Sequence, residues 1–243
     1  MPTGLLFLFF SLPTFLFVRD RAIGRGSELK VRVGESFRRV WDVVAHIAKY
    51  PGVVRFLVAK FFYENAISAV VIFMAVYAVK VMGFTDAVVM PFFIVSTVSA
   101  ILGSLACGRI VDRVGPKRTL EWVLMGWIFS LCVVLATSNR WVFWGAGSLI
   151  GIFLGSTWTT ARPLLVTLVP REMLGKFFGL YSFSGKAAAI VGPLIWGLVV
   201  FYFRAFDVLK YKFAVGSLLV LICVGLVILW GVPQAGREEP ALS

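Results

Sequence analysis

Four charged residues lie inside long apolar stretches of the sequence, where an unpaired charge is costly: Lys60, Glu64, Arg162 and Lys186. One carboxylate and three cations in such surroundings can hold an ionised solute, relay a proton or pair with one another. Their spacing along the chain limits which of these roles each residue can take.

Glu64 follows Arg55 by nine residues, which is about 13 Å along a helix. In a segment that crosses a bilayer, this depth is close to the middle of a hydrocarbon core about 30 Å thick. We expect Glu64 to be either a substrate or proton site or one member of a structural ion pair. Lys60 lies one turn earlier on the same face, where it either pairs with Glu64 or extends its ammonium to the cytoplasm, and we favour the second.

Lys186 follows Lys176 by ten residues, about 15 Å along a helix, which is too deep for its ammonium to reach the surface easily. It shares one helical face with small residues, namely Gly175, Gly179, Ser182 and Ala189. Such a strip lets another helix or a solvated cavity approach closely. We therefore expect Lys186 to line a cavity, with Glu64 or an anionic ligand balancing its charge.

Arg162 directly precedes Pro163. Because proline removes a backbone hydrogen bond one turn back, we expect a bend at this point. The guanidinium either binds a carboxylate or phosphate or reaches the cytoplasmic surface. Two aromatic residues of neighbouring segments, Trp158 and Tyr181, either line a pathway or serve as packing and interface residues.

Residues for enzymatic chemistry are scarce. The sequence has one histidine, His46, and three cysteines without the spacing of metal ligands. It contains no recognisable nucleophile with a neighbouring base, no phosphate-binding glycine loop and no metal-ligand cluster. We expect neither an enzyme nor a bound cofactor or metal.

The elements that position these residues are membrane helices. Hydrophobic residues make up 60% of the 243 residues and the mean hydropathy is +0.92, whereas soluble domains are about 45 to 50% apolar. The net charge of +12 falls in short clusters between apolar runs, which argues against nucleic acid as a partner. The pattern predicts an all-α membrane protein with about seven transmembrane helices, near residues 4–18, 56–80, 88–108, 121–137, 141–163, 177–203 and 213–232.

These segments divide the chain into four parts. Residues 1–18 form a short first span that looks like the latter part of a span rather than a signal peptide. Residues 19–55 form a basic cytoplasmic linker, in which apolar residues at helical spacing between Phe37 and Ile47 predict an amphipathic helix on the membrane surface. Residues 56–232 form a six-helix bundle, and residues 233–243 form a cytoplasmic tail.

The loops predict the orientation, because Lys and Arg gather on the cytoplasmic side of membrane proteins. With the N-terminus outside and the C-terminus inside, 16 of the 24 Lys and Arg residues lie in cytoplasmic segments and five in outer segments. We expect a multi-pass integral protein of the plasma membrane.

The stretch "GRIVDRVGPKR" (108–118) places five charges between two spans. The simplest interpretation is a cytoplasmic turn that anchors the chain by its positive charge. Its spacing also matches G-x-x-x-D-R-x-G-x-[KR]-[KR], the loop signature of the major facilitator superfamily, through Gly108, Asp112, Arg113, Gly115, Lys117 and Arg118.

The chain thus resembles a major facilitator transporter, and the resemblance can be narrowed. Residues 50–67 and 162–197 look like the C-terminal half of the vacuole-effluxer-like, or "unknown major facilitator", branch, and residues 10–18 are similar to the end of its sixth span. This implies spans six to twelve of an expected twelve. The resemblance also implies that the acid of the loop meets a helix N-terminus in the opposite half, and that the family exports small metabolites such as amino acids.

Two functions follow from these observations. The first is a secondary transporter, or its C-terminal half, that moves a small polar solute, anionic or zwitterionic, by alternating access, with its site between two repeats near the midplane. The second is a truncated remnant that does not transport, or a membrane subunit that needs a separate N-terminal half. The expected partners are the solute, the lipid bilayer and that half.

Overall fold

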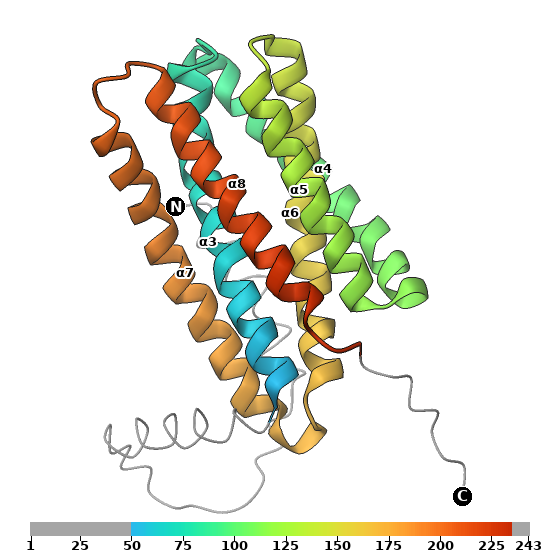
Figure 1. Cartoon of the computed structure of the whole chain (residues 1–243). Helices are drawn as coiled ribbons and strands as arrows, with labels where there is room; N and C mark the ends of the chain where they lie inside the picture. The colour runs from blue at the N-terminus through green and yellow to red at the C-terminus, as the bar shows by residue number, and fades with distance from the viewer. Residues whose placement is uncertain (1–49, 235–243) are drawn as a thin grey trace, which may run out of the picture. The chain divides into compact units, whose positions relative to one another are not determined.

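The computed structural model describes residues 50–234, and within them the chain forms a bundle of long helices (Figure 1). These are α3 (Pro51–Lys80), α4 (Asp86–Val114), α5 (Pro116–Ala136), α6 (Arg140–Leu168), α7 (Leu174–Tyr202) and α8 (Leu209–Trp230), with the short 3-10 helix η1 (Arg171–Met173) before α7. All six long helices can cross a membrane by length and composition. Even α5, with 21 residues, rises about 32 Å and so matches a hydrocarbon core of about 30 Å.

The all-α membrane fold is therefore confirmed, and six of the seven expected spans lie in the described range. The expected span 4–18 and the amphipathic helix between Phe37 and Ile47 lie outside the described residues, as do residues 235–243 of the tail. The helices extend further than the apolar pattern predicts. Helix α3 begins at Pro51 rather than at residue 56, because proline suits the first turn of a helix, where its missing N–H has no intrahelical partner.

The turn expected over residues 108–118 is much shorter in the structure. Helix α4 continues to Val114 and α5 begins at Pro116, so Gly115 alone joins them. The φ of Gly115 is 94°, a conformation that favours glycine. The prediction was wrong because hydropathy marks where a helix leaves the hydrocarbon, whereas the helix itself continues through its charged end.

The helices pair in a repeated pattern. Helix α3 packs on α7 and α8, α6 packs on α4 and α5, and α5 packs on α8. The first three helices can be matched in order with the last three, α3 with α6, α4 with α7 and α5 with α8. The pairs α3–α7 and α3–α8 then correspond to α6–α4 and α6–α5, and the pair α5–α8 corresponds to itself. Such a pattern is typical of two three-helix repeats.

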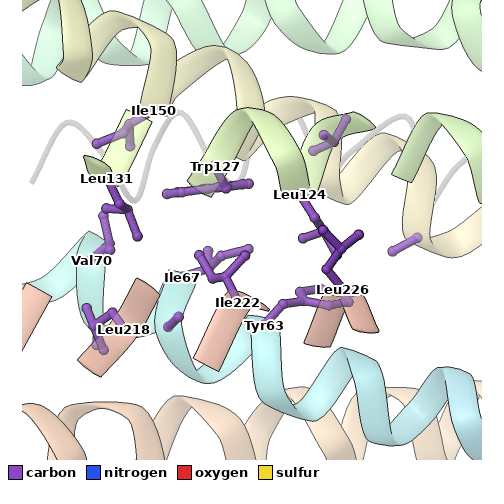
Figure 2. Packing of buried hydrophobic residues seen from close by; sticks show 14 of the residues in the cluster. Tyr63, Ile67, Val70, Leu124, Trp127, Leu131, Ile150, Leu218, Ile222 and Leu226 are labelled. Carbon is purple, nitrogen blue, oxygen red and sulfur yellow. The ribbon is translucent and has the colours of Figure 1, made fainter. Parts of the chain in front are cut away.

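The hydrophobic core lies mainly between α3, α5, α6 and α8 (Figure 2). At its centre Trp127 is fully buried, and its indole N–H donates to the Thr157 hydroxyl at 3.0 Å. The side chains labelled around it are Tyr63, Ile67, Val70, Leu124, Leu131, Ile150, Leu218, Ile222 and Leu226. Helices α4 and α7 bury few residues and lie at the margin of this core.

Glycines allow α4 and α6 to approach closely. A Cβ atom at Gly151 would collide with the Ser96 carbonyl oxygen, and one at Gly155 with the Ala100 carbonyl oxygen. Gly147 lies against the ring of Phe92. Glycine at every fourth residue of α6 thus gives the close packing of this pair of helices.

Both ends of the bundle are tied by side chains that bond to backbone. At the end that carries residues 108–118, Arg55 donates to the Gly231 carbonyl at 2.8 Å and Lys117 to the Trp230 carbonyl at 3.3 Å. These cations satisfy the last carbonyls of α8, where positive charge is favourable. At the other end Arg140 donates to the carbonyls of Met82 and Gly83.

Prolines are placed unevenly among the helices. Pro91, Pro163 and Pro193 lie inside α4, α6 and α7, whereas α3, α5 and α8 have none in their interior. Helix α6 continues through Pro163 to Leu168. Each internal proline removes one backbone hydrogen bond from its helix.

Candidate functional site

A cavity of about 900 Å³ opens on the side of the bundle where α3, α4, α6 and α7 meet. Its wall includes apolar side chains and one aromatic plane, Trp158, which is 56% exposed. Its polar lining comes from all four helices and consists of Glu64, Thr97, Ser104, Thr159, Arg162 and Tyr181. The cavity thus holds one carboxylate, one guanidinium and several hydroxyl groups.

Glu64 and Lys60 form an ion pair along one face of α3. Lys60 is 1% exposed, so its ammonium does not extend to the surface, and the snorkelling that we favoured is wrong. The same ammonium lies 4.1 Å from the centre of the Tyr181 ring. A carboxylate and an aromatic face together offset the cost of removing the cation from water. The Glu64 side chain is 22% exposed and lines the cavity.

Gly185 of α7 makes room for this pair. A Cβ atom at Gly185 would lie 3.0 Å from Lys60 Nζ and 3.3 Å from Glu64 Oε1. The neighbouring Ser184 hydroxyl donates to the Leu57 carbonyl at 3.4 Å, which also draws α7 onto α3. Sequence analysis did not single out Gly185. It follows Ser184 directly and Ser182 by three residues, and such small residues within an apolar span are typical of close helix packing.

Lys186 does not take part in this arrangement. It is exposed, it does not line the cavity, and no acidic group within residues 50–234 forms a salt bridge with it. The strip of small residues on its face is exposed as well. The expected partnership of Lys186 with Glu64 is therefore corrected: the local partner, one helical turn away, is Lys60.

Arg162 is the charged group of the cavity that stays unpaired within the described part of the chain. It is exposed, it lines the cavity one turn from Trp158, and its guanidinium lies beside the Tyr181 side chain. No salt bridge joins it to an acid of residues 50–234. A guanidinium in this position is available to a ligand.

Hydroxyl groups of the cavity were missed by sequence analysis. The hydroxyls of Ser104 and Thr159 lie 2.6 Å apart, linking α4 to α6. Thr159 also donates to the Gly155 carbonyl of its own helix at 3.0 Å. The sequence does hold one indication of these polar groups, because Thr97 and Ser104 are seven residues apart and share one helical face.

Trp158 and Tyr181, for which we left two roles open, both line the cavity.

The residues of the loop signature separate into two groups. Lys117 pairs with Glu121 at 3.6 Å and holds the end of α8. Asp112, Arg113 and Arg118 are exposed, and within residues 50–234 Asp112 has no salt bridge. Gly108 lies in α4, where a Cβ atom would meet no other atom within 4 Å.

The repeated helix pairs, the polar cavity and the loop signature together define a major facilitator transporter fold. The crystal structure of the POT family transporter PepTSo shares it, with a TM-score of 0.66 over 79% of this chain and 40% of that chain, at 14% identity.

The family model described as "Vacuole effluxer Atg22 like" matches residues 1–240, and the chain belongs to this family. It is 26% identical over 199 residues to the uncharacterised MFS-type transporter YxiO of Bacillus subtilis, covering 82% of this chain and 45% of YxiO. It is 22% identical to autophagy-related protein 22 of Candida glabrata, covering 83% of this chain and 39% of that protein. The chain thus spans less than half the length of these relatives. The family consists of transporters and not enzymes, as the sequence led us to expect.

Proposed function

We propose that the chain forms the C-terminal half of a secondary transporter, which moves a small polar solute across the membrane by alternating access. The observation that carries this proposal is the cavity, because Glu64 and Arg162 line it within membrane-spanning helices. Charged groups at such depth face water or protein rather than lipid. An opposing half-bundle would enclose the cavity and turn it into a pathway.

The same proposal includes an orientation and a direction. The end of the bundle with residues 108–118 faces the cytoplasm, because most Lys and Arg residues lie on that side. The direction is efflux, on the strength of the family's description. The plasma membrane stays our prediction for the location of this chain.

The second function, a subunit or remnant that does not transport alone, is favoured by one feature of the cavity. Arg162, Trp158 and Thr97 are exposed in the bundle, so the cavity is open on one side. A solute in such a cavity has no second wall. We therefore propose that transport needs an N-terminal half as a partner, and we expect the chain alone to give no flux.

Cysteine accessibility tests alternating access. Cys107, Cys132 and Cys223 are first replaced by serine or alanine, and Ser104→Cys is introduced in the cavity wall. The chain is produced with and without the N-terminal half of the Bacillus subtilis relative, in right-side-out and inside-out vesicles. With the partner half, an impermeant maleimide should label Ser104→Cys from either side, in proportions that change with membrane gradients.

Ser138→Cys is the matched control, because Ser138 is exposed in the turn between α5 and α6. It should be labelled from the outside only, in every condition. Labelling of Ser104→Cys from one side alone, with the partner half present, would overturn alternating access. Two-sided labelling without the partner half would show that the separate half is not needed.

A further inference from the structure

We propose that the cavity binds an amphipathic organic anion, whose carboxylate or phosphate group lies on Arg162 and whose apolar part enters a second cavity beyond Trp158. The proposal rests on the function proposed above and names the class of solute. Three observations carry it: the charge left over in the first cavity, the hydroxyl groups beside Arg162, and the second cavity along α6.

The charge of the first cavity is positive once its ion pair is counted. Glu64 lines the cavity, but its charge is already balanced by the ion pair with the buried Lys60. The backbone of Gly185 packs against this pair. Arg162 keeps its full charge, since no acid of residues 50–234 pairs with it. A cationic solute would therefore meet a neutral pair and a like charge, whereas an anion meets an unpaired guanidinium.

The groups around Arg162 suit an oxyanion. The planar guanidinium can donate two parallel N–H bonds to a carboxylate or a phosphate. Tyr181 lies beside it, and the hydroxyl pair of Ser104 and Thr159 lines the same cavity. Thr159 donates its hydrogen to the Gly155 carbonyl, so Ser104 is the donor within the pair. The Ser104 hydroxyl can turn its hydrogen from Thr159 toward an anion and so add a donor without adding charge.

The second cavity, of about 300 Å³, adjoins the first along α6. Thr97, Ala100 and Trp158 line both, and the rest of its wall is mostly apolar, with Phe92, Phe93 and Leu154. From Arg162 to Leu154 is eight residues, about 12 Å along the helix. A ligand with its anionic group on Arg162 can therefore place a ring or a short chain past Trp158, where apolar surface favours it.

A set of four small probes tests both ends of the site. The purified chain is placed in phosphatidylcholine nanodiscs, and equilibrium dialysis measures the binding of 4-phenylbutyrate, 4-phenylbutylamine, 4-phenylbutanol and butyrate, with empty nanodiscs subtracted. We expect 4-phenylbutyrate to bind at least about tenfold more tightly than each of the other three, because only it has both the anion and the ring. A parallel titration with 4-phenylbutylphosphonate shows whether a carboxylate or a phosphate-like group binds better.

Variants assign the two ends. Arg162→Gln should weaken 4-phenylbutyrate about tenfold and leave 4-phenylbutanol unchanged, whereas Arg162→Lys, which keeps the charge, should retain part of the affinity. Arg171→Gln removes an exposed arginine outside both cavities and should have no effect. Leu154→Trp should fill the second cavity and weaken 4-phenylbutyrate but not butyrate.

Three results would overturn the proposal: equal binding of the amine and the carboxylate, equal effects of Arg162→Gln and Arg171→Gln, or no binding of any probe to the folded chain. Anion binding on Arg162 together with one-sided labelling of Ser104→Cys would keep this site and reject transport. Two-sided labelling without anion preference would keep transport and reject the anionic solute.

Discussion

The ammonium of Lys60 lies 4.1 Å from the centre of the Tyr181 ring, and this contact joins α3 to α7. Glu64 holds the same ammonium from within α3, and Tyr181 also lines the cavity beside Arg162. A displacement of α7 therefore separates a buried cation from its aromatic partner. The packing of these two helices and the shape of the cavity depend on one small group of side chains.

The two members of the ion pair differ in burial, and this predicts which variant is less stable. Glu64→Gln leaves a lysine side chain that is 2% exposed without its carboxylate, whereas Lys60→Met leaves a carboxylate that is 22% exposed. We expect Glu64→Gln to lower the free energy of unfolding by about 3 kcal/mol and Lys60→Met by less. Titration with sodium dodecyl sulfate in mixed micelles measures both.

A double-mutant cycle completes this prediction. Lys60→Met with Glu64→Gln should recover most of the loss, since no buried charge then remains. Lys186→Met with Glu64→Gln should give additive losses, because Lys186 is exposed and forms no salt bridge with Glu64. Strong coupling in the second cycle would contradict the arrangement of α7 described above.

Gly185 should tolerate no large side chain. Gly185→Leu places carbon atoms where Lys60 and Glu64 lie, and we expect a loss of about 1 to 3 kcal/mol in the free energy of unfolding. Gly179→Leu is the matched control on the same helix, because a Cβ atom there meets nothing within 4 Å. Thermal unfolding in detergent compares the two, and equal losses would count against the close contact at Gly185.

Gly155 should be more sensitive than its position in an apolar helix suggests. A methyl group at Gly155 collides with the Ala100 carbonyl, which is backbone and cannot rotate away. We expect Gly155→Ala to lower the yield of folded protein severalfold and to separate α4 from α6. Gly145→Ala, in the same helix with open space around it, should be neutral; fluorescence-detected size-exclusion chromatography reads both.

The residues of the loop signature should have two different roles: Lys117 should stabilise the chain, and Asp112 should act in assembly with the N-terminal half. Lys117→Met removes the contacts with Glu121 and the Trp230 carbonyl and should cost about 1 kcal/mol. Asp112→Asn should change the stability of the chain by less than about 0.5 kcal/mol, because Asp112 is exposed and has no salt bridge within residues 50–234.

Asp112→Asn should instead weaken co-purification with a supplied N-terminal half. The carboxylate at this position is suited to a helix N-terminus, where it is favourable by about 0.3 to 1 kcal/mol, or up to about 2 when partly buried. If Asp112→Asn binds the partner half as well as the unchanged chain does, the loop signature only anchors the chain at the membrane surface by its positive charge.

Much of the site could be predicted, because charge inside an apolar helix is conspicuous in a sequence. Glu64 and Arg162 stand out in this way, and both line the cavity. Lys186 stands out equally, yet it does not line this cavity. Periodicity shows which residues share a face of one helix, but it does not show which neighbour that face meets. The pairing of Lys60 with Glu64 is local and was one of our two alternatives for Lys60. We favoured the other, because the contact of Lys60 with Tyr181 of α7 cannot be predicted from one helix.

Other features leave weak signals in a sequence for physical reasons. The hydroxyl of Thr159 bonds to a carbonyl of its own helix, so a threonine there costs little in an apolar segment and looks unremarkable. The charged ends of α4 and α5 look like a loop because hydropathy follows the bilayer. Both helices extend through these charged ends because Gly115 alone makes the turn between them. Its φ of 94° is seen only in the structure.

The uneven placement of prolines gives the bundle two walls of different stiffness. Helices α5 and α8 have no proline in their interior and pack around Trp127, whereas α4, α6 and α7, three of the four helices that line the cavity, each carry one. A helix bends most easily where proline removes a hydrogen bond. Gly115 alone connects α4 to α5, so this end of α4 is held close to the start of α5. We expect any displacement of α4 to take place by bending within the helix. We therefore expect the cavity to widen or narrow by bending of α4, α6 and α7, while α5 and α8 keep their shape.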